Sequence, residues 1–438
     1  MNLKKIRRSW YLYDWANSAF STTVVTVFLG PYLTNIADSA ADENGFINFL
    51  GFDIRGGSLY PYAISISVIL QVLILPIVGA IADRLKNRNM FLAFFAYLGA
   101  ISTMLLYFVE GDDFTLGALL FILANVSFGS AIVVYNSYLP DIASPDERDA
   151  ISSRGWAMGY AGGGLLLIAN LVLFILHESF GLTSEEAVRI SFFSAGFWWA
   201  MFGLVTVRGL RELNRPSGFV GKDAVVVGFK ELNQTYKDIK KYPETFKFLI
   251  AYLLYNDGIQ TVIALSGTYA IVELALGDTD LIITILIVQT VAFLGALALG
   301  RLAGKYGAKK VVLGSLVVWA VLVFTAYFIP EGAVYFYYGL GAGIGFVLGG
   351  SQALSRSLYS QVIPLDKEAK YFSFYEIAER GTAWIGTAAF GVAFTLTNSY
   401  RASILFLVVF FVLGGLLLTR VDVRKAIEQA GNKQPEII

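Results

Sequence analysis

The stretch GAIADRLKNR, residues 79–88, ends a long apolar segment, and a second version of it occurs in the other half of the chain. That version, GRLAGKYGAKK, spans residues 300–310 and begins 221 positions later. Pro140 and Pro364 repeat at nearly the same offset, 224 positions. A repeated offset indicates a duplicated unit, as in transporters whose halves are related by an axis along the membrane normal.

Composition indicates a membrane protein. Hydrophobic residues make up 56% of the 438 residues, charged residues only 15%, and the mean hydropathy is +0.63. Soluble domains carry about 25% charged residues, so a soluble enzyme is excluded as the simplest interpretation. The chain has no cysteine, one histidine and a formal net charge of zero. These counts exclude thiolate and Cys/His metal chemistry and favour no nucleic-acid partner. No phosphate-binding loop occurs, and no cofactor or metal is expected.

Twelve apolar segments are long enough to cross a bilayer, since a spanning helix needs about 20 residues. We predict spans in the first half near residues 10–34, 59–82, 90–109, 114–138, 150–176 and 189–208. We predict spans in the second half near residues 247–273, 279–303, 310–329, 332–357, 371–396 and 401–420. The predicted fold is all-α: a polytopic membrane protein with two pseudo-symmetric six-helix bundles, residues 1–208 and 247–421.

A polar linker, residues 209–246, separates the halves, and residues 422–438 form a tail. Apolar residues recur in the linker at alternating intervals of four and three between Val225 and Ile239, which predicts an amphipathic helix on the inner leaflet or a protein-docking surface. Of the 33 Lys and Arg residues, 29 fall on the side of the membrane that holds both termini. The positive-inside rule therefore predicts cytoplasmic termini and a cytoplasmic linker.

Four stretches of the sequence carry a family resemblance. The loop G-x-x-x-D-R-x-x-x-R at 79–88 resembles a signature of the major facilitator superfamily. YDWANSAF at 13–20, SSRGWAMGY at 152–160 and YNDG at 255–258 resemble the vacuolar amino-acid effluxer family of fungal autophagy and its bacterial relatives. The resemblance covers the whole chain. It implies twelve helices with alternating access, amino acids as the substrate class and, through the bacterial relatives, an inner (plasma) membrane location.

The chain departs from the family pattern in two places. The eleventh span reads YEIAERG at 375–381, with three charges where only polar residues are expected. The second copy of the loop signature has Gly304 at the position of Asp83.

Two classes of function remain. The first is a secondary active transporter that moves a small polar solute, with an amino acid as the implied class, alone or with a coupling proton or ion. The second is a transporter of lipid-like or drug-like molecules, or a non-transport membrane protein on the same scaffold. An enzyme would need its polar residues clustered near one leaflet, whereas here they are spread over several spans, which favours transport. We expect a monomer whose other partners are membrane lipids.

The loop signature predicts a conformational latch made by Gly79, Asp83, Arg84 and Arg88. An acidic side chain at a helix end accepts hydrogen bonds from a neighbouring helix N-terminus, and arginine pairs with carboxylates. Such a latch would hold one side of a transporter closed. The alternative is that the basic residues only set the topology.

Polar residues within the spans are the candidates for substrate or proton binding: Asp14, Asn17, Asn256, Asp257, Gln260, Glu376, Glu379 and Arg380. A charge at the bilayer centre costs roughly 2.5–3.5 kcal/mol or more, so it is retained for a reason. Asp257 follows Lys247 by ten residues, about 15 Å of helix rise. We expect it in a central cavity, where it binds a substrate cation or the coupling proton. The alternative is a permanently protonated Asp hydrogen-bonded to a neighbouring helix.

Two other charged groups have open interpretations. Asp14 is expected either to pair with Arg154 or to take part in transport. Glu376 and Arg380 are four residues apart and are expected to pair on one helix face. This pairing assigns no partner to Glu379. This triplet is either a structural cluster or part of the translocation site.

Overall fold

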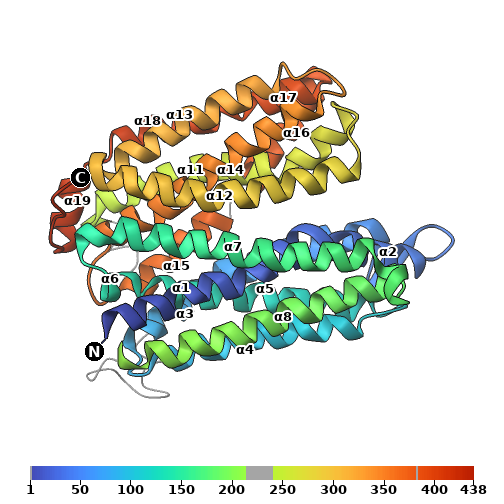
Figure 1. Ribbon diagram of the computed structural model, residues 1–438, viewed down its shortest axis with the longest axis horizontal. Helices are drawn as coiled ribbons and strands as arrows, with labels where there is room; N and C mark the ends of the chain where they lie inside the picture. Colours follow the sequence, from blue (N-terminus) through green and yellow to red (C-terminus); the bar gives the residue numbers. More distant parts are fainter. Residues whose placement is uncertain (1, 214–239, 381–382) are drawn as a thin grey trace.

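Two helical bundles lie side by side in the computed structural model, which describes residues 2–213, 240–380 and 383–438 (Figure 1). The first bundle contains α1 (Leu3–Ala19), η1 (Phe20–Phe28), α2 (Leu29–Ser39), α3 (Leu59–Arg84), α4 (Arg88–Leu105), α5 (Phe114–Asn136), α6 (Leu139–Ile142), α7 (Arg148–Ile175) and α8 (Ser184–Gly209). The second contains α11 (Pro243–Val272), α12 (Asp278–Tyr306), α13 (Ala308–Ala326), α14 (Val334–Val362), α15 (Glu368–Arg380), α16 (Ala383–Thr397), α17 (Tyr400–Phe406), α18 (Val408–Thr419) and α19 (Val423–Ala430).

The predicted membrane fold is confirmed, and the helices match the predicted spans closely. Ten segments of the described residues are long and apolar enough to cross a bilayer. They coincide with ten of the twelve predicted spans. The tenth predicted span falls on α14, and the eleventh falls on α15 and α16. The prediction of twelve spans is therefore consistent with the helices.

Short elements connect the helices outside the bundles. A two-stranded antiparallel hairpin, β1 (Phe46–Phe49) and β2 (Phe52–Arg55), follows α2 and departs from the all-α prediction. The remaining turns are 3-10 helices: η2 (Gly56–Ser58), η3 (Leu106–Phe108), η4 (Pro145–Glu147), η5 (His177–Phe180) and η6 (Leu210–Leu213).

The first span is longer than predicted and contains a π-helical segment, η1. Its hydroxyl side chains bond to the backbone of the same span: Thr22 donates to the Ser18 carbonyl at 2.8 Å, and Thr26 donates to the Ser21 carbonyl at 2.8 Å. Wide helical turns of this kind are frequent at functional sites. The segment lies in the wall of the cavity described below.

Each bundle has its own hydrophobic core. One cluster of buried apolar side chains comes almost entirely from the first bundle, and the other comes from the second. Because the cores are separate, the bundles can move relative to each other without unpacking either one. The predicted amphipathic helix of the linker lies outside the described residues.

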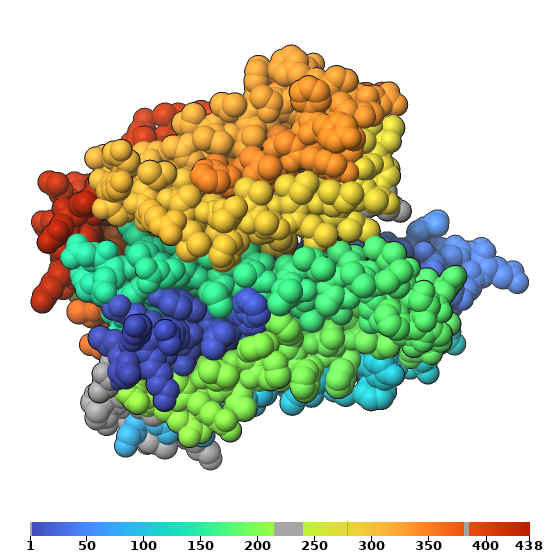
Figure 2. All heavy atoms as spheres, in the orientation of Figure 1, coloured from blue at the N-terminus to red at the C-terminus, as the bar shows by residue number. Residues whose placement is uncertain are grey.

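The C-terminal residues fold back over the end of the molecule where the bundles meet. The Asn432 amide donates to the carbonyls of Gln361 and Ile363, at 2.8 and 2.7 Å. The backbone N–H of Glu436 donates to Asp146 of the first bundle at 2.7 Å. Figure 2 shows this red segment against the teal residues of the first bundle. We call this end the termini end, because the N-terminal start of α1 lies there too (Figure 1).

The absence of cysteine allows a direct test of sidedness. Asp112, at the opposite end, and Lys433, in the tail, are both exposed and suit single-cysteine labelling. We expect Asp112→Cys to react with an impermeant maleimide in intact cells, and Lys433→Cys to react only after permeabilisation. Reaction of Lys433→Cys in intact cells would place the termini end outside and overturn the predicted orientation.

Candidate functional site: a cavity with a charged floor

A cavity of about 950 Å³ lies between the two bundles. Its walls come from both halves of the chain, and most of the lining side chains are apolar. The polar and charged residues of its lining include Asp14, Asn17, Ser18, Ser21, Thr22, Thr26, Asn136, Gln260, Gln289, Gln352, Arg356, Glu376, Glu379 and Arg380. The charged members come from α1, α14 and α15, which places the candidate site at the boundary between the bundles.

A buried ion pair in the cavity floor joins α1 to α14. Nη2 of Arg356 lies 3.2 Å from Oδ2 of Asp14, and the two residues are only 2% and 7% exposed. The Tyr135 hydroxyl donates to the same Asp14 oxygen at 2.8 Å. A buried ion pair is retained only when its remaining hydrogen-bonding groups are also satisfied, and this pair meets that requirement.

Arg356 is enclosed on its other sides by the first bundle. Its Nε donates to the Ser152 hydroxyl at 2.9 Å, and Nη2 donates to the Ser152 carbonyl at 2.9 Å. The guanidinium also lies over aromatic rings, with centroids 4.9 Å away in Trp10 and 5.4 Å away in Trp156. A planar guanidinium suits such a site because it donates in several directions and stacks on rings at the same time.

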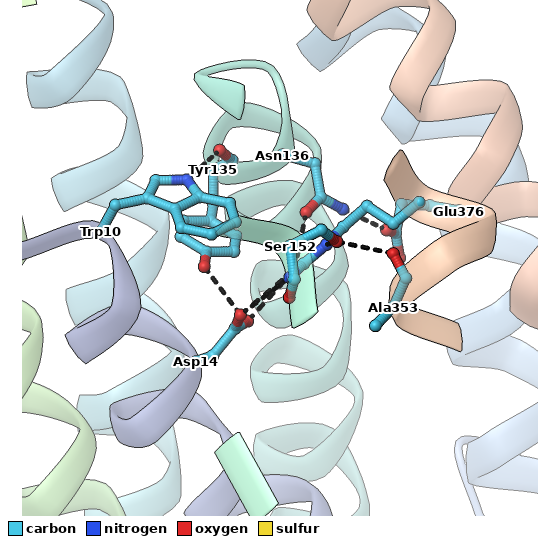
Figure 3. Close-up of polar contacts among 8 residues, drawn as sticks. Trp10, Asp14, Tyr135, Asn136, Ser152, Ala353 and Glu376 are labelled. Carbon is cyan, nitrogen blue, oxygen red and sulfur yellow. Dashed lines mark hydrogen bonds and ion pairs between the residues drawn. The ribbon is translucent and has the colours of Figure 1, made fainter. Parts of the chain in front are cut away.

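A polar chain continues from Arg356 across the cavity floor. Nη1 of Arg356 donates to Oδ1 of Asn136 at 3.3 Å, and Nδ2 of Asn136 donates to Glu376 at 2.9 Å. Nε of Arg380 then donates to the second oxygen of Glu376 at 3.1 Å. We call Asp14, Asn136, Ser152, Arg356, Glu376 and Arg380 the interface network. Figure 3 shows its labelled members converging from both bundles.

The interface network confirms one pairing expected from the sequence and corrects another. Glu376 and Arg380 pair along α15 as their spacing predicts. Asp14 does not pair with Arg154, because its carboxylate is held by Arg356 from the opposite bundle. Arg356 was not among the predicted site residues, because at the end of the tenth predicted span it resembles the loop cations that set the topology.

The other candidate residues divide into two groups. Asn17, Gln260 and Glu379 line the cavity with the interface network, and Glu379 also accepts the Tyr252 hydroxyl at 3.1 Å. Asn256 and Asp257 do not line it. The prediction that Asp257 lies in the central cavity is therefore wrong: it is 1% exposed and packs toward α16 instead. The position of Asp257 along α11 can be read from the sequence, but the side of the helix that faces the cavity cannot.

Beyond the cavity floor, the loop signature contacts the opposite bundle. The Asp83 carboxylate accepts the backbone N–H groups of Ala369 and Lys370, each at 2.8 Å. These amides belong to the first turn of α15, where N–H groups lack intrahelical acceptors and favour a negative charge. A Cβ on Gly79 would lie 2.8 Å from the Ala369 carbonyl carbon, so only glycine permits this close approach. Asp83 and Gly79 thus join α3 to α15.

Arg88 does not act across the bundles as the predicted latch requires. Its buried guanidinium pairs with Asp141 and donates to the Ser137 carbonyl, both within the first bundle. It also lies over the Tyr138 ring, 3.8 Å from the centroid. Arg88 therefore fixes the start of α4, just after the end of α3 that carries Asp83. Arg84 is the last residue of α3 and is only partly buried.

Further polar contacts close the same end of the cavity. Arg148 of α7 donates to the Ser360 carbonyl of α14 at 2.7 Å. The Gln361 amide donates to the Pro145 carbonyl at 2.7 Å. Both contacts join the bundles on the terminal side of the Asp14–Arg356 pair. The cavity lining extends the other way, to Thr26, Tyr60 and Tyr337. The bundles are therefore closed at the termini end.

Solved structures with the same arrangement define the fold. A bacterial homologue of the iron transporter ferroportin in an outward-facing state aligns with a TM-score of 0.68 at 15% identity, covering 95% of this chain and 98% of that one. The proton:xylose symporter XylE aligns with the same TM-score and identity, covering 95% of both chains. The fold is that of the major facilitator superfamily.

Sequence comparison identifies the family. Residues 2–431 match the family described as vacuole effluxer Atg22 like, and the chain belongs to it. The MFS-type transporter YxiO of Bacillus subtilis is 30% identical over 419 residues, which cover 94% of both proteins. Autophagy-related protein 22-1 of Sclerotinia sclerotiorum is 26% identical, covering 94% of this chain and 82% of that one. The chain is a transporter of the major facilitator superfamily rather than an enzyme.

The Asp14–Arg356 pair predicts a specific pattern of stability. Arg356→Ala leaves a buried carboxylate without its counterion, which costs about 3–5 kcal/mol. We expect a large fall in the melting temperature of the purified protein. The double variant Asp14→Ala/Arg356→Ala removes both charges and should recover part of the loss.

A thermal-unfolding double-mutant cycle with Asp14→Ala measures this coupling. Additive effects of the two single variants would show that the pair is not energetically coupled.

Proposed function

We propose that this transporter moves an amino acid by alternating access, with the interface network as the binding site. The observation that carries the proposal is the mixture of charges in the cavity floor. Glu376 and Glu379 supply carboxylates for an ammonium group, and Arg380 supplies a guanidinium for a carboxylate. Paired charges of both signs within one cavity suit a zwitterion better than a neutral or singly charged solute.

Arg380 is the group we expect the substrate carboxylate to meet first. Its side chain is 27% exposed, whereas that of Arg356 is 3% exposed and bonded on several sides. The Arg380 guanidinium lies 4.7 Å from the centroid of Phe128, a residue of the first bundle. A substrate held by Arg380 and Glu376 would therefore contact both bundles at once. The apolar walls leave room for a variable side chain, which is why a hydrophobic amino acid is the favoured cargo.

The closed termini end and the cavity lining support an outward-open state in the membrane. The positive-inside rule assigns the termini end to the cytoplasm, so the cavity would face the outside of the cell. We place the protein in the bacterial inner (plasma) membrane, as a monomer surrounded by lipid. Transport then requires the Asp83–α15 and Arg148–Ser360 contacts to break while the opposite end closes. Either a proton or another ion can bias this exchange.

The first test is solute transport in proteoliposomes. We expect the reconstituted protein to accumulate or release a radiolabelled amino acid when a proton or sodium gradient is imposed, and Glu376→Gln to abolish this activity. The Glu376→Gln carboxamide keeps the shape but carries no charge for a substrate ammonium group. Glu110→Gln is the control, because Glu110 pairs with Arg189 at the opposite end of the molecule, away from the cavity.

Two results would contradict the proposal. One is full activity in Glu376→Gln. The other is transport of apolar lipid-like or drug-like compounds with no response to any amino acid, which would favour the alternative class of substrate.

The second test concerns the latch. Asp83→Ala removes the charged cap of α15, and loss of a helix cap costs about 0.5–2 kcal/mol. A shift of this size changes the ratio of the two states by roughly 2–30-fold. We expect faster labelling of Ser360→Cys from the termini side in the Asp83→Ala background. The matched control is Asp141→Asn, which weakens the Arg88 pair inside the first bundle and should lower stability without increasing labelling. Labelling of Ser360→Cys at the same rate in the Asp83→Ala and Asp141→Asn backgrounds would contradict the latch role of Asp83.

A further inference from the structure

Buried oxygen atoms without partners gather on α11, outside the cavity lining. Asp257 and Thr261 are four residues apart and therefore lie on one face of the helix. Both carboxylate oxygens of Asp257 and the Thr261 hydroxyl lack a hydrogen-bond partner among the described residues. Asp257 is 1% exposed, and Thr261 is fully buried. Both side chains face Gly386 of α16, whose backbone lies beside the carboxylate.

An ionised carboxylate cannot remain in such a place without compensation. Burial of a charge away from water is strongly unfavourable unless the charge is paired, coordinates a metal or is neutralised by a proton. No described side chain hydrogen-bonds to either oxygen of the carboxylate. The compensating species therefore comes from solution, as a proton or a small cation.

We propose that Asp257 and Thr261 form a binding site for a sodium ion, separate from the interface network. One small cation can contact the carboxylate and the hydroxyl together, because all three unpartnered atoms are oxygens, the ligands that hard cations prefer. A proton would neutralise the charge but would occupy only one of these oxygens. The role of this ion in coupling rests on the proposed transport function, whereas its binding does not.

Gly386 lets the backbone of α16 approach both side chains closely. A Cβ at this position would lie 2.8 Å from Oδ2 of Asp257 and would also meet the Thr261 side chain. Any larger residue would therefore fill the space in front of the two oxygen-bearing side chains. Gln260, the neighbour of Thr261, lines the cavity, so the site lies directly behind the cavity wall. Occupancy of the site can thus influence the position of α11 against α16.

The test measures the melting temperature of the purified full-length protein, without substrate, at constant pH. Sodium chloride is titrated against choline chloride at constant ionic strength. A ligand that binds only the folded state raises the melting temperature, by about 3 °C at a hundredfold excess over its dissociation constant. We expect a saturable rise with sodium in the wild type, and its loss in Asp257→Asn, Thr261→Val and Gly386→Ala.

Thr290→Val is the matched control. Thr290 is an exposed hydroxyl residue of α12 that donates to the Leu286 carbonyl of its own helix. This variant should keep the full sodium response. If Asp257→Asn fails to fold, Thr261→Val and Gly386→Ala still test the site, because they leave the carboxylate in place.

Several outcomes would overturn the sodium site. Equal stabilisation of the wild type by sodium and choline would show that no specific ion binds. A response to pH without a response to sodium would assign the position to a proton. An undiminished sodium response in the site variants would place the ion elsewhere. None of these results depends on amino-acid transport, which is measured separately in proteoliposomes, so failure of the sodium site and failure of the proposed function are distinguishable.

Discussion

The burial of the Arg356 guanidinium between the two bundles is the constraint on which the rest of the structure depends. A charge in this position is tolerated only because the first bundle supplies Asp14, Ser152 and the faces of Trp10 and Trp156 around it. These groups come from α1 and α7, so both helices must keep their register against α14. Separating the bundles at the termini end would expose Arg356 to water and leave Asp14 without its partner. The same ion pair therefore holds the cavity floor together and opposes its opening.

The duplicated loop signature shows how one sequence unit takes different roles in the two halves. Gly79 of α3 packs against α15, and its counterpart Gly300 of α12 packs against Ser153 of α7. The pseudo-symmetry thus extends to the way each copy contacts the opposite bundle. The acidic cap does not repeat, since Gly304 replaces Asp83, and a Cβ at Gly304 would meet no described residue within 4 Å. Among the described residues, the first copy holds the N-terminus of α15 in the other bundle through Asp83, so the proposed latch is built from one half.

The spans, the loop signature and the Glu376–Arg380 pair can be predicted from the sequence, because each depends on local periodicity or spacing. A contact cannot be predicted in this way where the partner of a side chain lies far away in the chain. Arg356 meets Asp14 across 342 positions, and nothing near Arg356 in the sequence indicates that partner. The prediction that Asp257 lines the cavity is wrong for another reason. The depth of Asp257 along α11 is predictable from the sequence, but the side of the helix that faces the cavity depends on how both bundles pack. Polar residues occur on both sides of α11, with Gln260 toward the cavity and Thr261 toward α16, so no single polar stripe decides between the sides.

The contacts at the termini end also set how much binding free energy a substrate must supply to open that end. Moving a population from 1:99 to 99:1 requires about 5.5 kcal/mol of differential binding. Each hydrogen bond to a charged group contributes about 1.5–3 kcal/mol, so a few such bonds lie within reach of that value. A zwitterion bound to Glu376 and Arg380 would disturb the chain of bonds from Glu376 through Asn136 to Arg356. Because that chain ends at Asp14, substrate binding and release of the cavity floor would be coupled through neighbouring contacts rather than through a distant path.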